Sequence, residues 1–318
     1  MTQNSPPKVL ISGAGLSGLF LAILLEKASI SYHVYERAPT LKPLGASLGL
    51  NANILPAFEQ LGLLEELAQI SLPLTSLGLY NENLGHMGTV DLSGFKTKTG
   101  YDSYIFHRPD LYNVLLSKVP TDKISFNKKI VGVEQNEDGV TIHTSNGETF
   151  HGDILVGSDG AYSTIRQAIY KDMAEKEILP VSDMEAPTWA TSWLTTTLPN
   201  NRIAFSVKVQ LDEKAVNEAR GQRQVTYQLP IKYTLTRRSC DYSGRLDDLI
   251  ENTDPEMISS ILLEEKLLET WDYGRTVLIG DACQKMNPST GQGAVKAFQD
   301  AVVLVNCLYD LLSENDDG

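Results

Sequence analysis

The sequence predicts an α/β fold: a Rossmann-like domain on a parallel sheet, joined to a smaller, mainly β domain. A glycine-rich turn at residues 13–18 follows a short apolar strand and opens an apolar helix. A second apolar strand leads into Ser158-Asp159-Gly160, and a third leads into Asp281 before another helix. Apolar strands that end in glycines or acids and pass into helices are typical of βαβ units, where ligands bind at the carboxyl ends of parallel strands.

The first motif lies in a predicted strand-to-helix turn, between apolar runs at 8–12 and 16–25. Gly13 permits the tight turn, Gly15 lets a pyrophosphate approach the backbone, and Gly18 lets the helix pack closely on the strand. The helix N-terminus adds free N–H groups and the positive end of its dipole. The turn therefore predicts a dinucleotide site.

The next predicted strand along the chain after the first motif and its helix, residues 32–36, ends on Glu36. An acid roughly 20 residues beyond the turn is where a carboxylate accepts hydrogen bonds from a ribose. The alternative is a glycine-rich turn in an ordinary α/β protein. The order of strand, turn, helix, strand and acid favours the nucleotide site over that alternative.

The third motif adds a second set of ligand-binding groups at the carboxyl ends of the parallel strands; we call this set the second clamp. A strand at 275–280 runs into Asp281, and a helix begins near Gly291 and continues through Ala294. Asp281 can accept from ribityl or ribose hydroxyls, and N–H groups near Gly291, Gly293 and Ala294 can face the negative charge of a reduced flavin. A nicotinamide dehydrogenase has no need of this clamp, so the motifs together predict bound FAD.

Composition limits the function classes. The chain has 318 residues, 42% of them hydrophobic, which is enough for one large or two modest domains. A net charge of −13 argues against nucleic acid, because a phosphate-binding surface needs clustered Lys and Arg. The five histidines show no metal-ligand spacing, so no metal site is predicted.

Cysteine usage and the N-terminus predict a compartment. The three cysteines form no CxxC pair, and no apolar signal-peptide segment precedes Val9. We therefore expect an intracellular protein, cytoplasmic or peripherally associated with a membrane. The longest apolar stretch, residues 9–25, is interrupted by the three glycines of the turn and is not predicted to span a membrane.

The pattern along the chain predicts two domains. Residues 54–70 are amphipathic, residues 77–80 and 88–92 alternate as strands, and Arg108-Pro109-Asp110 opens a helix. The predicted FAD-binding domain comprises 1–71, 106–175 and 265–318, and the substrate domain, for which a shortened form is the alternative, comprises 72–105 and 176–264.

The ordered motifs resemble group A FAD-dependent monooxygenases, which share the aromatic-hydroxylase fold. Residues 45–50, Arg108, residues 278–283 and 291–294 are similar to fungal paxilline-type epoxidases of indole-diterpene and meroterpenoid pathways. The likeness covers residues 8–170 and 255–310 and is weak between them. The family often has His where this chain has Gln284. Many relatives also continue into a long hydrophobic, sometimes membrane-bound, tail, whereas this chain ends about one helix past the third motif.

The resemblance implies where FAD is bound. Glu36 and Arg37 lie on the adenosine side, Gly49 in the loop after the second strand, Arg108 near the pyrophosphate, Asp281 by the ribityl phosphate and Ala294 by the flavin ring. Asp159 matches a motif that in the family touches FAD and influences NAD(P)H use, whereas the residues alone make it a turn former. The complete set of predicted cofactor-binding residues is Gly13, Gly15, Gly18, Glu36, Arg37, Gly49, Arg108, Asp159, Asp281, Gly293 and Ala294.

The resemblance also implies a reaction. NADPH would bind transiently and reduce the flavin, which would react with O₂ to give a C4a-hydroperoxide that epoxidises or hydroxylates a large apolar, prenylated secondary metabolite. Such chemistry needs little from side chains beyond position and a dry cavity, so no catalytic acid or base is assigned. Tyr227 and Tyr233 are candidate substrate-orienting hydroxyls, with a buried structural role as the alternative.

Two other readings stay open at this point. A nicotinamide dehydrogenase would use the first motif alone and would be colourless. A catalytically silent, truncated flavoprotein would be yellow but would show no substrate-stimulated NADPH oxidation. Flavin halogenation is disfavoured, because Trp189 and Trp193 do not form a Trp-x-Trp-x-x-Pro motif.

Overall fold

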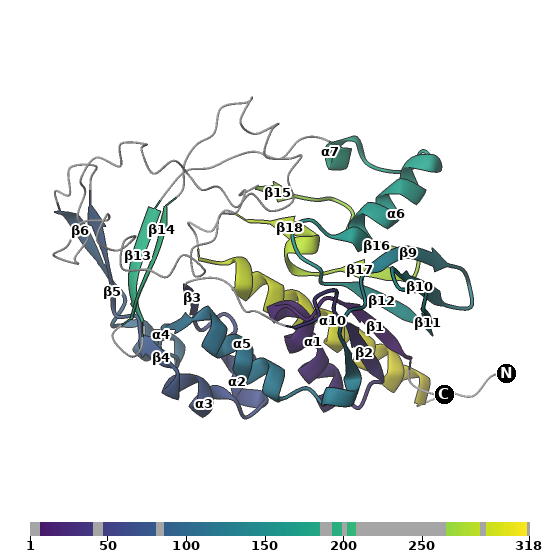
Figure 1. The fold of residues 1–318 in the computed structure, drawn as a ribbon. Helices are drawn as coiled ribbons and strands as arrows, with labels where there is room; N and C mark the ends of the chain where they lie inside the picture. Colours follow the sequence, from purple (N-terminus) through teal and green to yellow (C-terminus); the bar gives the residue numbers. More distant parts are fainter. Residues whose placement is uncertain are drawn as a thin grey trace.

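The computed structural model is built around a six-stranded sheet with the order β16-β17-β12-β1-β2-β8 (Figure 1). All neighbouring strands are parallel except β16 and β17. The strands are β16 Asp272–Tyr273, β17 Thr276–Leu278, β12 Ile154–Gly157, β1 Val9–Ser12, β2 Tyr32–Tyr35 and β8 Ile124–Ser125. The structure describes residues 7–40, 47–80, 86–184, 193–198, 202–207, 265–286 and 291–316. The predicted parallel sheet of an α/β fold is confirmed.

The four central strands end in register. Ser12 at the end of β1 pairs with Tyr35 of β2 on one side and with Gly157 of β12 on the other. Gly157 in turn pairs with Leu278 of β17. The carboxyl ends of four strands far apart in the sequence therefore meet along one edge of the sheet, and each is followed by a predicted motif.

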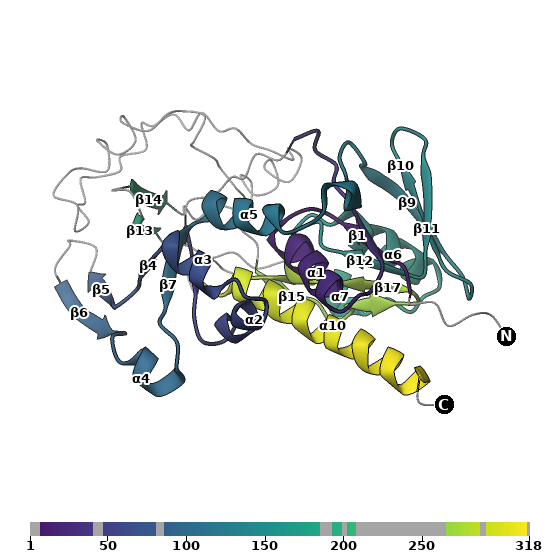
Figure 2. The same ribbon diagram turned by 90° about the horizontal axis from the view of Figure 1, so that it is seen from below.

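Helices cover one face of this sheet, and a helix with a second sheet covers the other (Figures 1 and 2). Val9 and Ile11 belong to the core under the helices, whereas Leu10 belongs to the core on the opposite face. Successive side chains of a strand point to opposite faces, so a strand buried on both sides is apolar throughout. The first layer contains α1 Leu16–Lys27, α5 Arg108–Ser117 and α10 Gly293–Asp316, and the second contains α6 Thr164–Glu175, β9 Ile130–Gln135, β10 Val140–Thr144 and β11 Thr149–Gly152.

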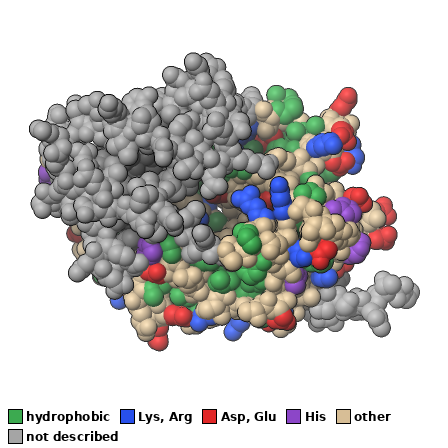
Figure 3. All heavy atoms as spheres, viewed as in Figure 1, with side chains coloured by type: hydrophobic (Ala, Val, Ile, Leu, Met, Phe, Trp, Pro, Cys, Tyr) green, Lys and Arg blue, Asp and Glu red, His purple; other side chains and the backbone are tan. Residues whose placement is uncertain are grey.

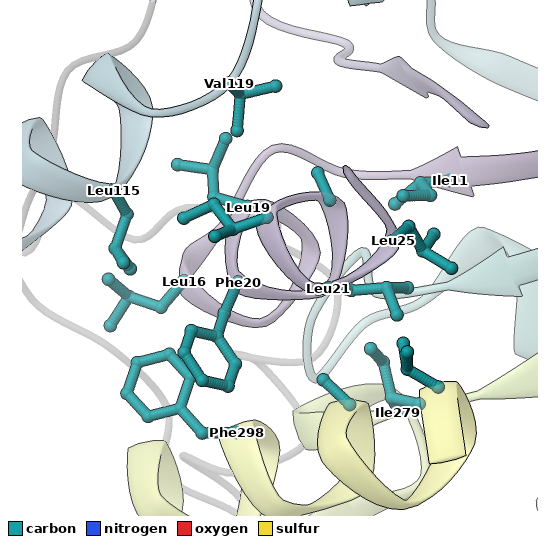
Figure 4. Packing of buried hydrophobic residues seen from close by; sticks show 14 of the residues in the cluster. Ile11, Leu16, Leu19, Phe20, Leu21, Leu25, Leu115, Val119, Ile279 and Phe298 are labelled. Carbon is teal, nitrogen blue, oxygen red and sulfur yellow. The ribbon is translucent and has the colours of Figure 1, made fainter. Parts of the chain in front are cut away.

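Aromatic side chains join α1 to α10 (Figure 4). The centroid of the Phe20 ring lies 4.7 Å from the ring centroids of both Phe58 and Phe298. All three side chains are fully buried, and burying one Phe contributes about 1.5–3 kcal/mol. This packing fixes the long C-terminal helix across the helix of the glycine-rich turn, so the N-termini of α1 and α10 are held in one rigid layer.

The predicted amphipathic segment 54–70 forms two short helices, α2 Leu55–Gln60 and α3 Leu64–Gln69. Gly62 interrupts it with φ +71°, a left-handed conformation that ends the first helix. The strands predicted at 77–80 and 88–92 are confirmed as the hairpin of β5 Ser76–Tyr80 and β6 His86–Asp91.

A three-stranded antiparallel sheet lies beside α5. It consists of β3 Ser47–Leu50, β7 Tyr104–His107 and β4 Ser71–Pro73, with β7 in the middle. The strand β7 runs directly into α5, so this sheet sets the start of the helix that carries Arg108.

The remaining elements are short. They are α4 Phe95–Thr99, η1 Thr121–Lys123, α7 Val181–Met184, β13 Trp193–Leu198, β14 Arg202–Val207, β15 Lys266–Leu267, η3 Gly280–Ala282 and β18 Gln284–Lys285. The division into two domains stays a prediction, because residues 208–264 lie outside the described residues. This range includes the candidate residues Tyr227 and Tyr233, and Trp189 also lies outside the described residues. No helix in the described ranges is both long and apolar enough to cross a membrane.

Candidate functional site

The predicted motifs converge where the four parallel strands end. Glu36 follows β2, Gly13 follows β1, Asp159 comes two residues after β12, and Asp281 comes three residues after β17. The third motif also touches the helix of the first, because a Cβ placed on Gly280 would lie 3.3 Å from the Ser17 hydroxyl of α1. The edge of the sheet therefore gathers these segments at one place.

The three glycines of the turn meet different surroundings. Gly13 has φ +103°, and a Cβ there would lie 2.8 Å from the carbonyl oxygen of Ser158. A Cβ on Gly18 would lie 2.0 Å from the carbonyl oxygen of Gly13, far inside contact distance. Among the described residues, apart from its chain neighbours, no atom lies within 4 Å of the position that a Cβ on Gly15 would take. Two glycines are thus required by the protein itself, while the third borders open space.

Hydrogen bonds lock the turn to its neighbours. The Ser158 hydroxyl lies 2.8 Å from the carbonyl oxygen of Ser12 and 3.0 Å from that of Gly13. On the other side of the turn, the Ala14 N–H donates to Glu36 Oε2 at 2.8 Å. The second motif and the acid of the second strand therefore both fix the conformation of the first motif.

Glu36 keeps capacity for a ligand. Its side chain is buried, and its two oxygens accept one hydrogen bond each, from the N–H groups of Ala14 at 2.8 Å and Ala38 at 2.9 Å. A carboxylate has about four lone-pair sites, so about two remain for hydroxyl donors. Arg37 follows with an exposed side chain.

Arg108, at the start of α5, and Asp281, in η3, interact electrostatically. Both side chains are exposed, yet desolvation by surrounding protein lowers the pKa of the Arg108 guanidinium and raises that of the Asp281 carboxyl. The charge of Arg108, with a smaller effect of Lys285, opposes the rise in the Asp281 pKa. The pair therefore offers one cationic and one accepting group to the same ligand.

Asp159 caps a helix. Its Oδ2 accepts from the N–H groups of Thr164 at 2.6 Å and Ile165 at 3.3 Å, at the start of α6. Burial raises the pKa of this carboxyl, and the hydrogen bonds oppose that rise. The other oxygen, Oδ1, is buried and has no hydrogen-bond partner among the described residues. The turn-forming role is thus present, and one acceptor remains beside it.

The structure corrects the position of Gly49. Sequence reasoning placed it in a loop after the second strand, but it lies in β3, paired with Ile105 of β7. A Cβ there would lie 3.7 Å from the Tyr104 carbonyl oxygen, which is an ordinary contact, so the strand itself does not require glycine. Gly293 begins α10 and Ala294 follows it with a partly buried side chain.

Sequence reasoning missed two polar residues that support the site, of which Arg166 is buried and Asp300 is partly buried. Arg166, on α6, donates to the carbonyl oxygens of Ala282 at 2.6 Å and Ala161 at 2.7 Å, which ties the second motif to the third. Asp300, on α10, accepts from the N–H of Gly280 at 2.8 Å and from the side-chain amide of Gln284 at 2.9 Å. The only sequence signal that could have indicated Arg166 and Asp300 was a charged residue on an otherwise apolar helix face.

These features fit an extended, phosphate-bearing dinucleotide. Open space borders Gly15, α1 begins there without a side-chain cap, and free acceptors stand at Glu36 and Asp281. Figure 3 shows Lys and Arg side chains gathered near the middle of one face, although the chain is acidic overall. The residues present therefore suit FAD. Within the described ranges no group of three or more His, Cys, Asp or Glu side chains could hold a metal ion.

Comparison with known proteins supports the same cofactor. Residues 7–317 match the sequence family described as FAD binding domain. The aurachin C monooxygenase/isomerase of Stigmatella aurantiaca is 27% identical over 316 residues, covering 94% of this chain and 80% of that protein. The FAD-dependent monooxygenase nvfK of Aspergillus novofumigatus is 28% identical over 335 residues, covering 96% of this chain and 71% of that protein.

Solved structures share the fold. Klebsiella pneumoniae HpxO, crystallised with FAD and uric acid, superposes with a TM-score of 0.67 at 22% identity, covering 95% of this chain and 79% of that one. The Rossmann-like fold class predicted from the sequence is therefore confirmed both by the sheet and by this neighbour.

Proposed function

The chain belongs to the FAD-binding-domain family and is an FAD-dependent monooxygenase; on this premise we propose that it uses NAD(P)H and O₂ to epoxidise or hydroxylate a hydrophobic, prenylated secondary metabolite. The resemblance to group A monooxygenases is confirmed by the family match and by these relatives. In the proposed reaction NAD(P)H, a proton, O₂ and the substrate give NAD(P)⁺, water and a product that has gained one oxygen atom from O₂.

The observation that carries this function is the register of the four strand ends. Tyr35, Ser12, Gly157 and Leu278 stand side by side, and each leads into a segment suited to part of FAD. An extended ligand held at several points along its length needs such an edge. A site for nicotinamide dinucleotide alone would leave the third motif and its support from Asp300 without a role.

On the adenosine side, we assign the pyrophosphate to Gly13, Gly15 and Gly18 and the ribose to Glu36. The N-terminus of α1 faces open space at Gly15, which suits a doubly charged group. Glu36 already holds the Ala14 N–H, so a ribose hydroxyl bonded to the same carboxylate would lie against the turn. The exposed Arg37 is placed to approach the adenosine from the solvent side.

On the flavin side, we assign the ribityl chain and phosphate region to Asp281 and Arg108. The carboxylate can accept hydroxyl hydrogen bonds, and the guanidinium, whose charge acts on Asp281, can neutralise phosphate charge beside it. We also assign the N–H groups at the start of α10, at Gly293 and Ala294, to the flavin ring. Gly49 pairs with Ile105 of β7, the strand that runs into Arg108, and Asp159 follows β12 beside the glycine-rich turn, so both are assigned to the same site.

When bound, FAD supplies the chemistry: in its reduced form it activates O₂ and transfers one oxygen atom. The side chains bind it, orient it and exclude water, which is the reason no catalytic acid or base is proposed. The prenylated substrate rests on the likeness to fungal monooxygenases, such as nvfK. Within the predicted substrate domain, 72–105 and 176–264, residues 208–264 lie outside the described residues.

Two measurements on the purified chain test the function. We expect flavin absorbance at one FAD per chain, and NAD(P)H oxidation with O₂ consumption that rises when a prenylated aromatic compound is added. A colourless chain that binds no added FAD would contradict the cofactor assignment. A yellow chain whose NAD(P)H oxidation no substrate stimulates would favour the catalytically silent flavoprotein instead.

A further inference from the structure

The peptide group between Ala14 and Gly15 is held from outside the turn by a tyrosine on α5. The Tyr112 hydroxyl donates to the carbonyl oxygen of Ala14 at 2.9 Å, across 98 residues of sequence. Only 6% of the Tyr112 residue is exposed, and its ring packs in the core with α1. Burial, followed by the charge of Glu36, raises the pKa of this phenol, which therefore stays protonated and able to donate.

Because the peptide bond is planar, the hydrogen bond to the Ala14 carbonyl also sets the direction of the Gly15 N–H. In a trans peptide the carbonyl group of one residue and the N–H group of the next point in opposite directions. The Ala14 carbonyl points to Tyr112 on α5, so the Gly15 N–H points away from α5. A Cβ on Gly15 would find no atom within 4 Å, so this part of the backbone borders open space.

The preceding peptide is held in the same way from both sides. The Ser158 hydroxyl lies 3.0 Å from the carbonyl oxygen of Gly13, and Glu36 accepts from the N–H of Ala14 at 2.8 Å. The two peptide planes before Gly15 are thus fixed by three side chains from three different segments. Tyr112 is the one that acts on the plane whose N–H belongs to Gly15.

We propose that Tyr112 is a positioning residue for the cofactor: its hydroxyl fixes the Ala14–Gly15 peptide plane so that the Gly15 N–H is aimed at the pyrophosphate before FAD arrives. Preorganised donors bind more tightly because less orientational freedom is lost on binding. The proposal rests on the proposed FAD site, and it deepens that site by adding a residue that does not itself contact the ligand.

The alternative is a tyrosine that serves core packing alone. Phenylalanine would then replace it without loss of cofactor affinity, since the ring is what packs. Tyr170 on α6 provides a matched control. Its hydroxyl is also partly buried and bonded, to Asp183 at 3.1 Å and to the Thr270 carbonyl oxygen at 3.1 Å, and neither partner is among the residues assigned to FAD.

The test compares Tyr112→Phe with Tyr170→Phe in the full chain, freed of bound flavin. Dissociation constants are measured for FAD by flavin fluorescence and for ADP, which carries only the adenosine and pyrophosphate, by competition with FAD. We expect Tyr112→Phe to raise both constants by the same factor, about fivefold, which is the size of one net hydrogen bond. Tyr170→Phe is expected to leave both constants unchanged.

Several outcomes would overturn the proposal. Unchanged constants in Tyr112→Phe would reduce the residue to packing, and equal losses in both variants would reveal a general loss of stability. A change for FAD without one for ADP would place the effect away from the pyrophosphate. Urea unfolding of each flavin-free variant establishes that it is folded before binding is compared; a Tyr112→Phe chain that cannot fold would show a structural role and overturn the positioning role. If the parent chain binds no FAD, the proposed function itself fails first.

Discussion

Alanine at two glycines of the nucleotide turn should separate folding from cofactor binding. At Gly18 a Cβ would lie 2.0 Å from the carbonyl oxygen of Gly13 and 2.7 Å from the Ser158 hydroxyl. Backbone has to move to relieve the first contact. Overpacking of this kind costs about 1–3 kcal/mol, and a contact this short against backbone places the cost near the upper end.

At Gly15 the same substitution brings the new Cβ within 4 Å of no non-neighbouring atom among the described residues. The residue is the N-cap of α1 with φ −75°, which alanine adopts freely, and the Cβ enters open space. We therefore expect Gly15→Ala to change the free energy of unfolding of the flavin-free chain by less than about 1 kcal/mol.

For FAD binding we expect a large effect from Gly15→Ala, the substitution that has the smaller effect on stability. The methyl group of Gly15→Ala occupies the space through which the pyrophosphate reaches the backbone. Losing two charge-assisted hydrogen bonds, at about 1.5 kcal/mol each, lowers FAD affinity by about 3 kcal/mol, a factor of roughly 100 in Kd. The assays are urea unfolding of the flavin-free variants and fluorescence titration with FAD. Parent-like FAD affinity in Gly15→Ala, or parent-like stability in Gly18→Ala, would refute this reasoning.

Four further substitutions, at three residues, probe the other segments. Asp281→Ala should release most bound FAD, and equal flavin content in variant and parent would remove Asp281 from the site. Because burial raises the pKa of the Asp281 carboxyl, Asp281→Asn should stabilise the flavin-free chain at high pH, with the gain shrinking as pH falls through that pKa; a gain that grows with falling pH would contradict the sign. Glu36→Ala should raise the Kd for FAD, and an unchanged Kd would exclude its ribose contact. Asp300→Ala should cost about 1–3 kcal/mol in urea unfolding, because Gly280 N–H and the Gln284 amide lose their acceptor; a parent-like midpoint would show that the contacts are dispensable.

The sequence predicted the parts of the fold whose signals are local. The strand, the turn with a glycine at φ +103°, and the helix from Leu16 follow from residue order alone. The same holds for Glu36 just past β2 and for Asp281 just past β17. Hydrophobic runs of strand length, followed by glycine and a helical pattern, are sufficient for these predictions.

Other features depend on pairing between distant segments. Gly49 lies in a strand because Ile105 pairs with it, and a sequence of small residues gave no sign of that partner. The helix α6, from Thr164, was not predicted; Asp159 and Ser163 both cap its start, although the loop sequence was interpreted only as a turn. Its interior carries the buried Arg166, a residue that propensity assigns to surfaces.

The residues that support the site were missed for the same reason. Tyr112 and Ala14 are 98 residues apart, and Arg166 and Ala282 are 116 apart. A buried polar group needs a partner, but the sequence does not say which backbone carbonyl supplies it. The motifs could therefore be found one by one, whereas the hydrogen bonds that hold them together required the structure.

Hydrogen–deuterium exchange during FAD titration tests the convergence of the motifs most directly. Amides in residues 13–18 belong to the first motif, and those in residues 281–285 and 293–296 belong to the two ends of the third motif, between β17 and α10. If one FAD molecule binds across all of them, exchange in the three segments slows together, with the same midpoint in FAD concentration. Slower exchange at 13–18 alone, with the other two segments unaffected at saturating FAD, would contradict the shared site.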